Sequence, residues 1–194
     1  MKSILILLTV ALCAGNSFAQ GGGELRILDT ENHIVTASKK GASIVFTMEA
    51  IADFTEDRDS SRSLGTGWDY AGIRVDINNN NVVDRGVDVA FGLRQKTNIF
   101  CAQYLIQENA SSGCGGLRSK GKARVGFMST ISQATPHPVH VYEIPLAELA
   151  RGGGKIGLTF VFSDASTGRS YYPSRRNPRS FNETIQLDLS ELDF

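Results

Sequence analysis

The stretch at residues 68–92 constrains the fold more than any other part of the sequence. Apolar side chains alternate with other residues along both of its ends, in Ala71-Gly-Ile-Arg-Val75 and again in Val87-Asp-Val-Ala-Phe91. A period of two residues is typical of a β-strand whose two faces differ. The centre between these runs consists almost wholly of Asn and Asp. The stretch therefore predicts a β-hairpin with a polar, acidic loop.

Oxygen-bearing side chains recur in this loop at the spacing of a calcium-binding loop. In such a loop, alternate side chains and one backbone carbonyl turn inward onto a hard cation. The last acid comes one residue later than in an EF-hand, which favours a calcium loop between two strands over a helix-loop-helix. An Asx-rich turn without metal is the alternative, because Asn and Asp favour turns anyway. The predicted calcium ligands are Asp76, Asn78, Asn80, Val82 through its carbonyl, Asp84 and Asp88.

The N-terminus has the features of an export signal. Met1-Lys2 precedes an apolar run at residues 4–14, and Ser17-Phe18-Ala19 offers the small residues that a signal peptidase requires. We expect residues 1–19 to be a signal peptide and residues 20–194 to form a single domain of ordinary size. No second apolar run is long enough to span a bilayer. The sequence therefore predicts a secreted protein, either periplasmic or extracellular.

Export limits the cysteine chemistry and the partners of the mature chain. Removal of the signal leaves Cys101 and Cys114, which we expect to form a disulfide in an oxidising compartment. Such a bridge contributes roughly 3 kcal/mol in the chain-entropy model. The formal net charge is +0 and the sequence has neither a basic tract nor an acidic tail, so nucleic acid is not a predicted partner.

Short runs of β-branched and aromatic residues make up most of the remaining sequence. Gly, Ser or Pro separates each run from the next, as expected for strands joined by turns. Only residues 145–150, which a run of glycines follows, resemble a helical turn. The sequence predicts an all-β fold, an antiparallel β-sandwich of jelly-roll type with one short helical turn. The predicted strands outside the hairpin are 24–29, 33–38, 42–54, 98–107, 120–128, 138–144, 155–162 and 183–189.

Three segments in the second half are similar to a known group of domains. They are His140-Val-Tyr-Glu-Ile-Pro-Leu-Ala-Glu-Leu149, Gly154-Lys-Ile-Gly-Leu-Thr-Phe-Val-Phe-Ser-Asp164 and Tyr171-Tyr-Pro-Ser174. Together they resemble the closing half of family 9 carbohydrate-binding modules and DOMON-like β-sandwich domains. In those domains a strand ends in an Ile-Pro-Leu turn, a Gly-led strand follows, and a Tyr/Trp-Pro loop precedes the last strand. Residues 68–76 resemble their middle, so the resemblance extends from residue 42 onward.

The resemblance implies a secreted, non-catalytic binding module with a glycan as ligand and a structural calcium ion. Glycan recognition uses flat aromatic rings and a few polar donors. Family 9 sugar sites use two tryptophans, whereas this chain contains a single Trp. That residue stands at the start of a core-like strand, which favours a packed position for it, and the basic loop near residue 176 is also consistent with a solvated surface turn. The predicted ligand-binding residues are Trp68, Arg169, Tyr171, Tyr172, Arg175 and Arg176.

Two other classes of function remain open at this point. One is a calcium-stabilised structural or protein-interaction domain at the cell surface, with no sugar ligand. The other is a small secreted hydrolase that uses the acids at residues 53–59. The sequence has no Gly-x-Ser-x-Gly elbow, no phosphate-binding glycine loop and no His-Glu-x-x-His, so we expect it not to be an enzyme.

Overall fold

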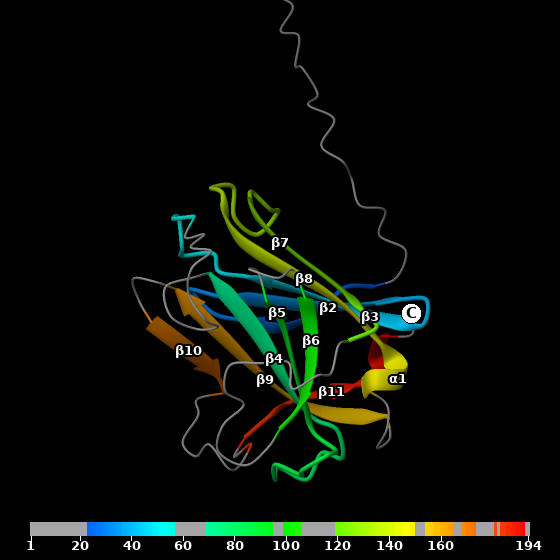
Figure 1. The fold of residues 1–194 in the computed structure, drawn as a ribbon. Helices are drawn as coiled ribbons and strands as arrows, with labels where there is room; N and C mark the ends of the chain where they lie inside the picture. The colour runs from blue at the N-terminus through cyan, green and yellow to red at the C-terminus, as the bar shows by residue number, and fades with distance from the viewer. Residues whose placement is uncertain are drawn as a thin grey trace, which may run out of the picture.

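The computed structural model describes residues 23–56, 69–94, 99–105, 119–149, 154–164, 168–173, 181 and 183–192. Figure 1 shows that the described chain consists mainly of strands. These are β1 (Leu25–Asp29), β2 (Ile34–Lys40), β3 (Ser43–Glu49), β4 (Tyr70–Asp76), β5 (Val89–Arg94), β6 (Ile99–Tyr104), β7 (Lys122–Met128), β8 (His137–Pro145), β9 (Lys155–Asp164), β10 (Gly168–Tyr172) and β11 (Ile185–Asp188). The helical pieces are α1 (Leu146–Leu149) and the 3-10 turn η2 (Leu189–Leu192).

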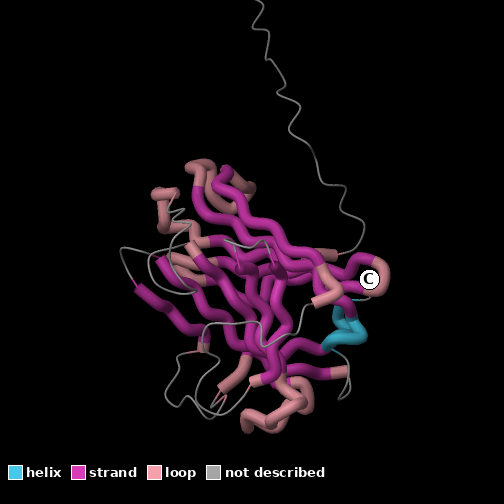
Figure 2. The backbone as a smooth tube through the Cα atoms, viewed as in Figure 1, coloured by secondary structure: helices cyan, strands magenta, loops and turns pink. Residues whose placement is uncertain are grey.

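The strands form two antiparallel sheets. The first sheet has the order β1-β2-β3-β8-β7, and the second has the order β10-β9-β4-β5-β6. Strand β11 also pairs with β9, along residues 155–158, while β10 pairs with residues 160–164. In Figure 1, strands β7, β8, β2 and β3 lie above β10, β9 and β11. Figure 2 shows how little helix accompanies the strands. The predicted antiparallel β-sandwich is confirmed.

The core lies between the two sheets because each strand alternates its side chains. On β3, Phe46 and Met48 are fully buried, and on β4 the same is true of Ala71, Ile73 and Val75. The residues between them face outward, as the period of a strand requires. Burial of each large side chain of this kind contributes about 1.5–3 kcal/mol. The alternation visible in the sequence therefore marks the surface that holds the sheets together.

The short elements show where the sequence predictions were accurate and where they were not. Helix α1 confirms the predicted helical turn, and the buried side chain of Leu149 attaches it to the core. Strand β10 differs from the prediction, because the resemblance to known domains places Tyr171-Tyr-Pro-Ser174 in a loop. The predicted signal peptide lies within residues 1–22, outside the described chain, and stays a prediction. No helix in the described residues is long and apolar enough to cross a membrane.

Candidate functional site

The outer face of the second sheet carries the described part of the predicted ligand site. Paired residues of antiparallel strands stand side by side on the same face of a sheet. Two neighbouring rows make up this surface: Arg169, Ser163 and Tyr70 in one, and Tyr171, Val161, Gly72 and Gly92 in the next. They face outward because Ala71 and Ile73, between them on β4, face the core. We call Tyr70, Arg169 and Tyr171 the aromatic face.

Tyr70 lies flat on the sheet because two glycines leave room for its ring. A Cβ atom added at Gly72 or at Gly92 would lie 2.5 Å from the Tyr70 hydroxyl oxygen, so any side chain there would displace the tyrosine. Burial raises the pKa of Tyr70 to about 12, with smaller electrostatic effects from Arg169 and Tyr171. These effects show that the three members of the aromatic face lie within electrostatic range of one another.

Tyr172 occupies the opposite side of the sheet from Tyr171. It pairs with Phe160 of β9 and packs against the core, and its ring meets Phe162 edge-on at 6.1 Å between ring centroids. Its hydroxyl lies 2.9 Å from Nδ1 of His33, a residue that precedes β2 of the first sheet. Burial lowers the pKa of His33 to about 4, despite the nearby acids. Tyr172 thus links the two sheets, whereas Tyr171 belongs to the outer surface.

The other predicted ligand residues, Trp68, Arg175 and Arg176, lie outside the described residues, and their part in a site stays a prediction. The structure adds a residue that was not predicted, Arg74. It follows Tyr70 and Gly72 on the same face of β4, and its guanidinium carbon lies 5.4 Å from the centre of the Phe181 ring. The alternation along β4 was the signal that could have identified it. Phe181 also packs with Val83 and Leu105, and this cluster covers one end of the outer face.

The predicted calcium loop, residues 76–88, winds around the side chain of Asp76. This carboxylate is fully buried and accepts hydrogen bonds from the backbone N–H groups of Asn80 at 3.2 Å and Asn81 at 2.7 Å. Asn81 takes the left-handed conformation, with φ of 61°, at the place where calcium loops usually have glycine. Asn79 is left-handed as well, with φ of 54°. The loop backbone therefore turns inward around this acid.

Asp88 closes the loop from its other end. It is also fully buried, and it accepts hydrogen bonds from the N–H groups of Ile77 at 3.0 Å and Asp84 at 2.5 Å. The pKa of Asp88 is raised to about 6, chiefly by burial; the backbone hydrogen bonds act to lower it, and the negative charges of Asp76 and Asp84 act to raise it. Burial raises the pKa of Asp76 in the same way. Keeping the carboxylates of Asp76 and Asp88 ionised therefore lowers the stability of the folded state.

Asp84 lies between the side chains of two asparagines. Its Oδ2 accepts hydrogen bonds from Nδ2 of Asn78 at 2.7 Å and Nδ2 of Asn80 at 2.6 Å, and these bonds lower its pKa. The candidate metal ligands of the loop are carboxylate, amide and carbonyl oxygens, which are the ligand types that calcium prefers. Rotation of the Asn78 amide exchanges its nitrogen for its oxygen. In the described residues no three His, Cys, Asp or Glu side chains are grouped closely enough to hold a metal ion as they stand.

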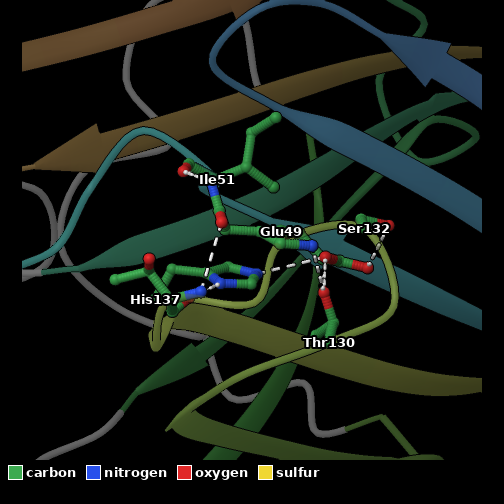
Figure 3. A network of polar contacts seen from close by, with 7 residues as sticks. Glu49, Ile51, Thr130, Ser132 and His137 are labelled. Carbon is green, nitrogen blue, oxygen red and sulfur yellow. Dashed lines mark hydrogen bonds and ion pairs between the residues drawn. The ribbon is translucent and has the colours of Figure 1, made fainter.

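A second buried polar cluster joins β3 to the turn between β7 and β8 (Figure 3). Glu49 Oε2 accepts a hydrogen bond from Thr130 Oγ1 at 2.7 Å and lies 3.1 Å from Nε2 of His137. The other ring nitrogen of His137 lies 2.9 Å from the Thr135 carbonyl oxygen. Ser132 Oγ donates to Glu49 Oε1 at 3.5 Å. The hydroxyls bond to the acid and not to the imidazole, so the cluster lacks a hydroxyl activated by a histidine.

One half of the predicted disulfide falls in the described chain. Cys101 lies on β6, opposite Gly92 of β5, and is buried. Cys114 lies outside the described residues, so the pairing stays a prediction.

Comparison with known proteins supports the fold. Two solved structures of a family 9 carbohydrate-binding module from Caldicellulosiruptor kristjanssonii match the chain. The complex with cellotriose has a TM-score of 0.51 and 12% sequence identity, and the match covers 84% of this chain and 78% of that one. The complex with glucose has a TM-score of 0.50 and 10% identity, with 86% and 83% covered. No family model and no curated protein matches the chain. The fold is therefore like that of family 9 carbohydrate-binding modules, as the sequence resemblance indicated.

Proposed function

We propose that this chain is a non-catalytic carbohydrate-binding domain that acts after export, with the aromatic face as its ligand surface. The observation that carries the proposal is the gathering of Tyr70, Tyr171 and Arg169 on one outer face of the second sheet. The structurally similar modules were solved with cellotriose and with glucose, which supports a glycan as the ligand.

The chemistry of the aromatic face suits a pyranose ring. The apolar face of a sugar ring packs on a flat aromatic side chain, and its hydroxyls need planar donors at the rim. Tyr171 is partly exposed beside the exposed Arg169, so a ring and a guanidinium stand next to each other. The ring of Tyr70 lies on the sheet over Gly72 and Gly92, beside these two residues. Trp68 precedes Tyr70 by two residues in the sequence, and we include it as a second aromatic contact.

We also propose that loop 76–88 binds a calcium ion, which acts as a structural cofactor. The ligands would be Asp76, Asp84 and Asp88, together with the oxygens of Asn78 and Asn80 and the Val82 carbonyl. When bound, the ion supplies positive charge to carboxylates whose burial makes their ionisation costly. A structural role for the ion is consistent with the contacts of the loop. The Asn81 carbonyl oxygen accepts a hydrogen bond from the Phe181 N–H at 3.3 Å, so the loop is attached to the cluster that covers one end of the outer face.

A polysaccharide and glycan-array assay on the mature chain tests the sugar proposal. Tyr171→Ala and Arg169→Ala should abolish or strongly weaken binding, because they remove the stacking ring and its donor. Tyr172→Phe is the matched control: it changes a neighbouring tyrosine that faces the interior, and it should keep the affinity. Silence of the wild-type chain across a broad array would contradict the proposal and would favour a structural or protein-interaction domain.

A further inference from the structure

Strands β4 and β5 separate at the aromatic face. Their ladder runs from the Val75–Val89 pair to the Gly72–Gly92 pair and stops there, although β4 continues back to Tyr70 and β5 continues to Arg94. The next pair in that register would be Ala71 and Leu93. Backbone groups that leave a ladder inside a protein need other partners, since an unpaired buried group is costly.

Side chains from the first sheet supply these partners through the core. The hydroxyl of Tyr142 on β8 donates to the Ala71 carbonyl oxygen at 2.5 Å and accepts the Leu93 N–H at 3.1 Å. It thus stands in the place of the missing ladder bond. Two residues earlier on the same face of β8, His140 Nε2 lies 3.1 Å from the Asp69 carbonyl oxygen and donates to it. Both side chains are buried, so neither bond is exposed to water.

These two hydrogen bonds fix the backbone on both sides of Tyr70. The carbonyls of residues 69 and 71 are held from the core side, while the Tyr70 ring lies on the outer side, over Gly72 and Gly92. The two tyrosines interact electrostatically across the sheet. If the Tyr142 hydroxyl were absent, Ala71 and Leu93 would be free to pair directly. The strands would then close, and the Tyr70 ring would shift on its glycine floor.

We propose that Tyr142, with His140, is a positioning residue of the ligand surface: its hydroxyl keeps β4 and β5 apart and so sets where Tyr70 stands. This proposal rests on the proposed sugar-binding function. Two core residues of the first sheet would then determine the shape of the outer face of the second sheet. The aromatic face is then built by both sheets, although all of its members come from one.

The test compares Tyr142→Phe with Ile144→Val, a conservative change at the next inward position of β8. Two quantities are measured on the mature chain: the affinity for cellotriose by calorimetry, and the ring resonances of Tyr70 by NMR with labelled tyrosine, assigned with Tyr70→Phe. Tyr142→Phe should shift the Tyr70 resonances and weaken binding by about tenfold. Ile144→Val should leave both quantities close to the wild-type values.

Unmoved Tyr70 resonances in folded Tyr142→Phe would overturn the proposal, as would an affinity equal to that of the control. If the wild-type chain binds no sugar, the proposed function fails, while the resonances still decide whether Tyr142 positions Tyr70. If Tyr142→Phe does not fold, the pair His140→Gln and His140→Leu replaces it. Gln retains a donor for the Asp69 carbonyl and should keep the Tyr70 resonances near their wild-type values, whereas Leu should shift them, and equal spectra would refute the positioning role.

Discussion

Two buried acidic regions of this protein differ in the partners of their carboxylates. Glu49 is bonded by side chains: its Oε2 lies 3.1 Å from Nε2 of His137 and accepts a hydrogen bond from Thr130 Oγ1 at 2.7 Å. In loop 76–88, Asp76 and Asp88 are bonded to backbone N–H groups, which carry no net charge. The carboxylate of the first region thus has side-chain partners within the fold, and we expect an external cation to act on the second region.

The largest effect is expected where a buried charge loses its partner. His137→Phe should lower the free energy of unfolding by about 3 kcal/mol, because it leaves the Glu49 carboxylate buried without its imidazole. Denaturant unfolding measures this change. The double variant Glu49→Gln, His137→Phe should recover part of the loss, since the charge is then gone. A loss as small as that expected for an exposed ion pair would show that the buried Glu49 does not depend on His137. The contrast between this cluster and loop 76–88 would then fail.

The next effect concerns calcium. A ligand that binds only the folded state stabilises it by about 2.7 kcal/mol at a concentration one hundred times its Kd. The melting temperature of the mature chain should therefore be higher in calcium than in chelator. The variant Asp76→Ala, Asp84→Ala should show no such difference, and His137→Phe should retain it. An unchanged melting temperature in the wild type would contradict the calcium proposal.

A pH dependence should come from His140. Burial lowers its pKa from 6.5 to about 4, so the folded state binds a proton less readily than the unfolded state. The stability that the neutral ring contributes is complete above pH 6.5 and is lost as the pH falls towards 4, at about 1.4 kcal/mol per pH unit. Denaturant unfolding between pH 7 and 4 should show this decline, and His140→Gln should flatten it.

Asp88 acts in the opposite direction over part of the same range. Its pKa is raised to about 6, so without calcium its protonation stabilises the folded state as the pH falls below 6. Asp88→Asn should therefore make the decline with acid steeper. A decline that neither variant alters would refute these assignments and would place the acid sensitivity elsewhere.

The smallest effect belongs to charges that remain in water. Lys40 of β2 and Glu143 of β8 form an ion pair at 3.0 Å across β3 of the first sheet, with the lysine side chain 67% exposed. Lys40→Ala should change the free energy of unfolding by less than about 0.5 kcal/mol. Denaturant unfolding at low and high salt checks this value. A loss as large as that of His137→Phe would remove the distinction between buried and exposed charge.

The sequence predicted most of the fold because alternation is a local signal. Strands β3 and β11 were identified in this way, within the predicted ranges 42–54 and 183–189, whereas the helical turn was indicated by the glycines that follow it. The pairing of β3 with β8 was not predictable, since it joins residues almost a hundred positions apart, such as Thr47 and Val141. Strand β10 was missed because its short sequence, Gly168-Arg-Ser-Tyr-Tyr172, lacks β-branched residues and forms a strand only by pairing with β9.

The candidate site was predictable in its residue types but not in its orientation. Arg169 and Tyr171 were selected from the sequence, and so was their neighbour Tyr172. Only the register with β9 shows that Tyr171 stands opposite Val161 on the outer face, whereas Tyr172 stands opposite Phe160 on the inner one. The position of the Tyr70 ring was not predictable from the sequence for a similar reason, because it depends on Gly92, which lies on another strand.

An NMR titration of the isotope-labelled mature chain with cellotriose, in the presence of calcium, tests the central claim most directly. The account predicts that the amide signals of Tyr70, Gly72, Arg169 and Tyr171 shift on addition of the sugar. Signals from the outer face of the first sheet, such as those of Thr36 and Thr47, should stay in place. An unchanged spectrum, or shifts confined to the first sheet, would contradict the assignment of the aromatic face as a sugar-binding surface.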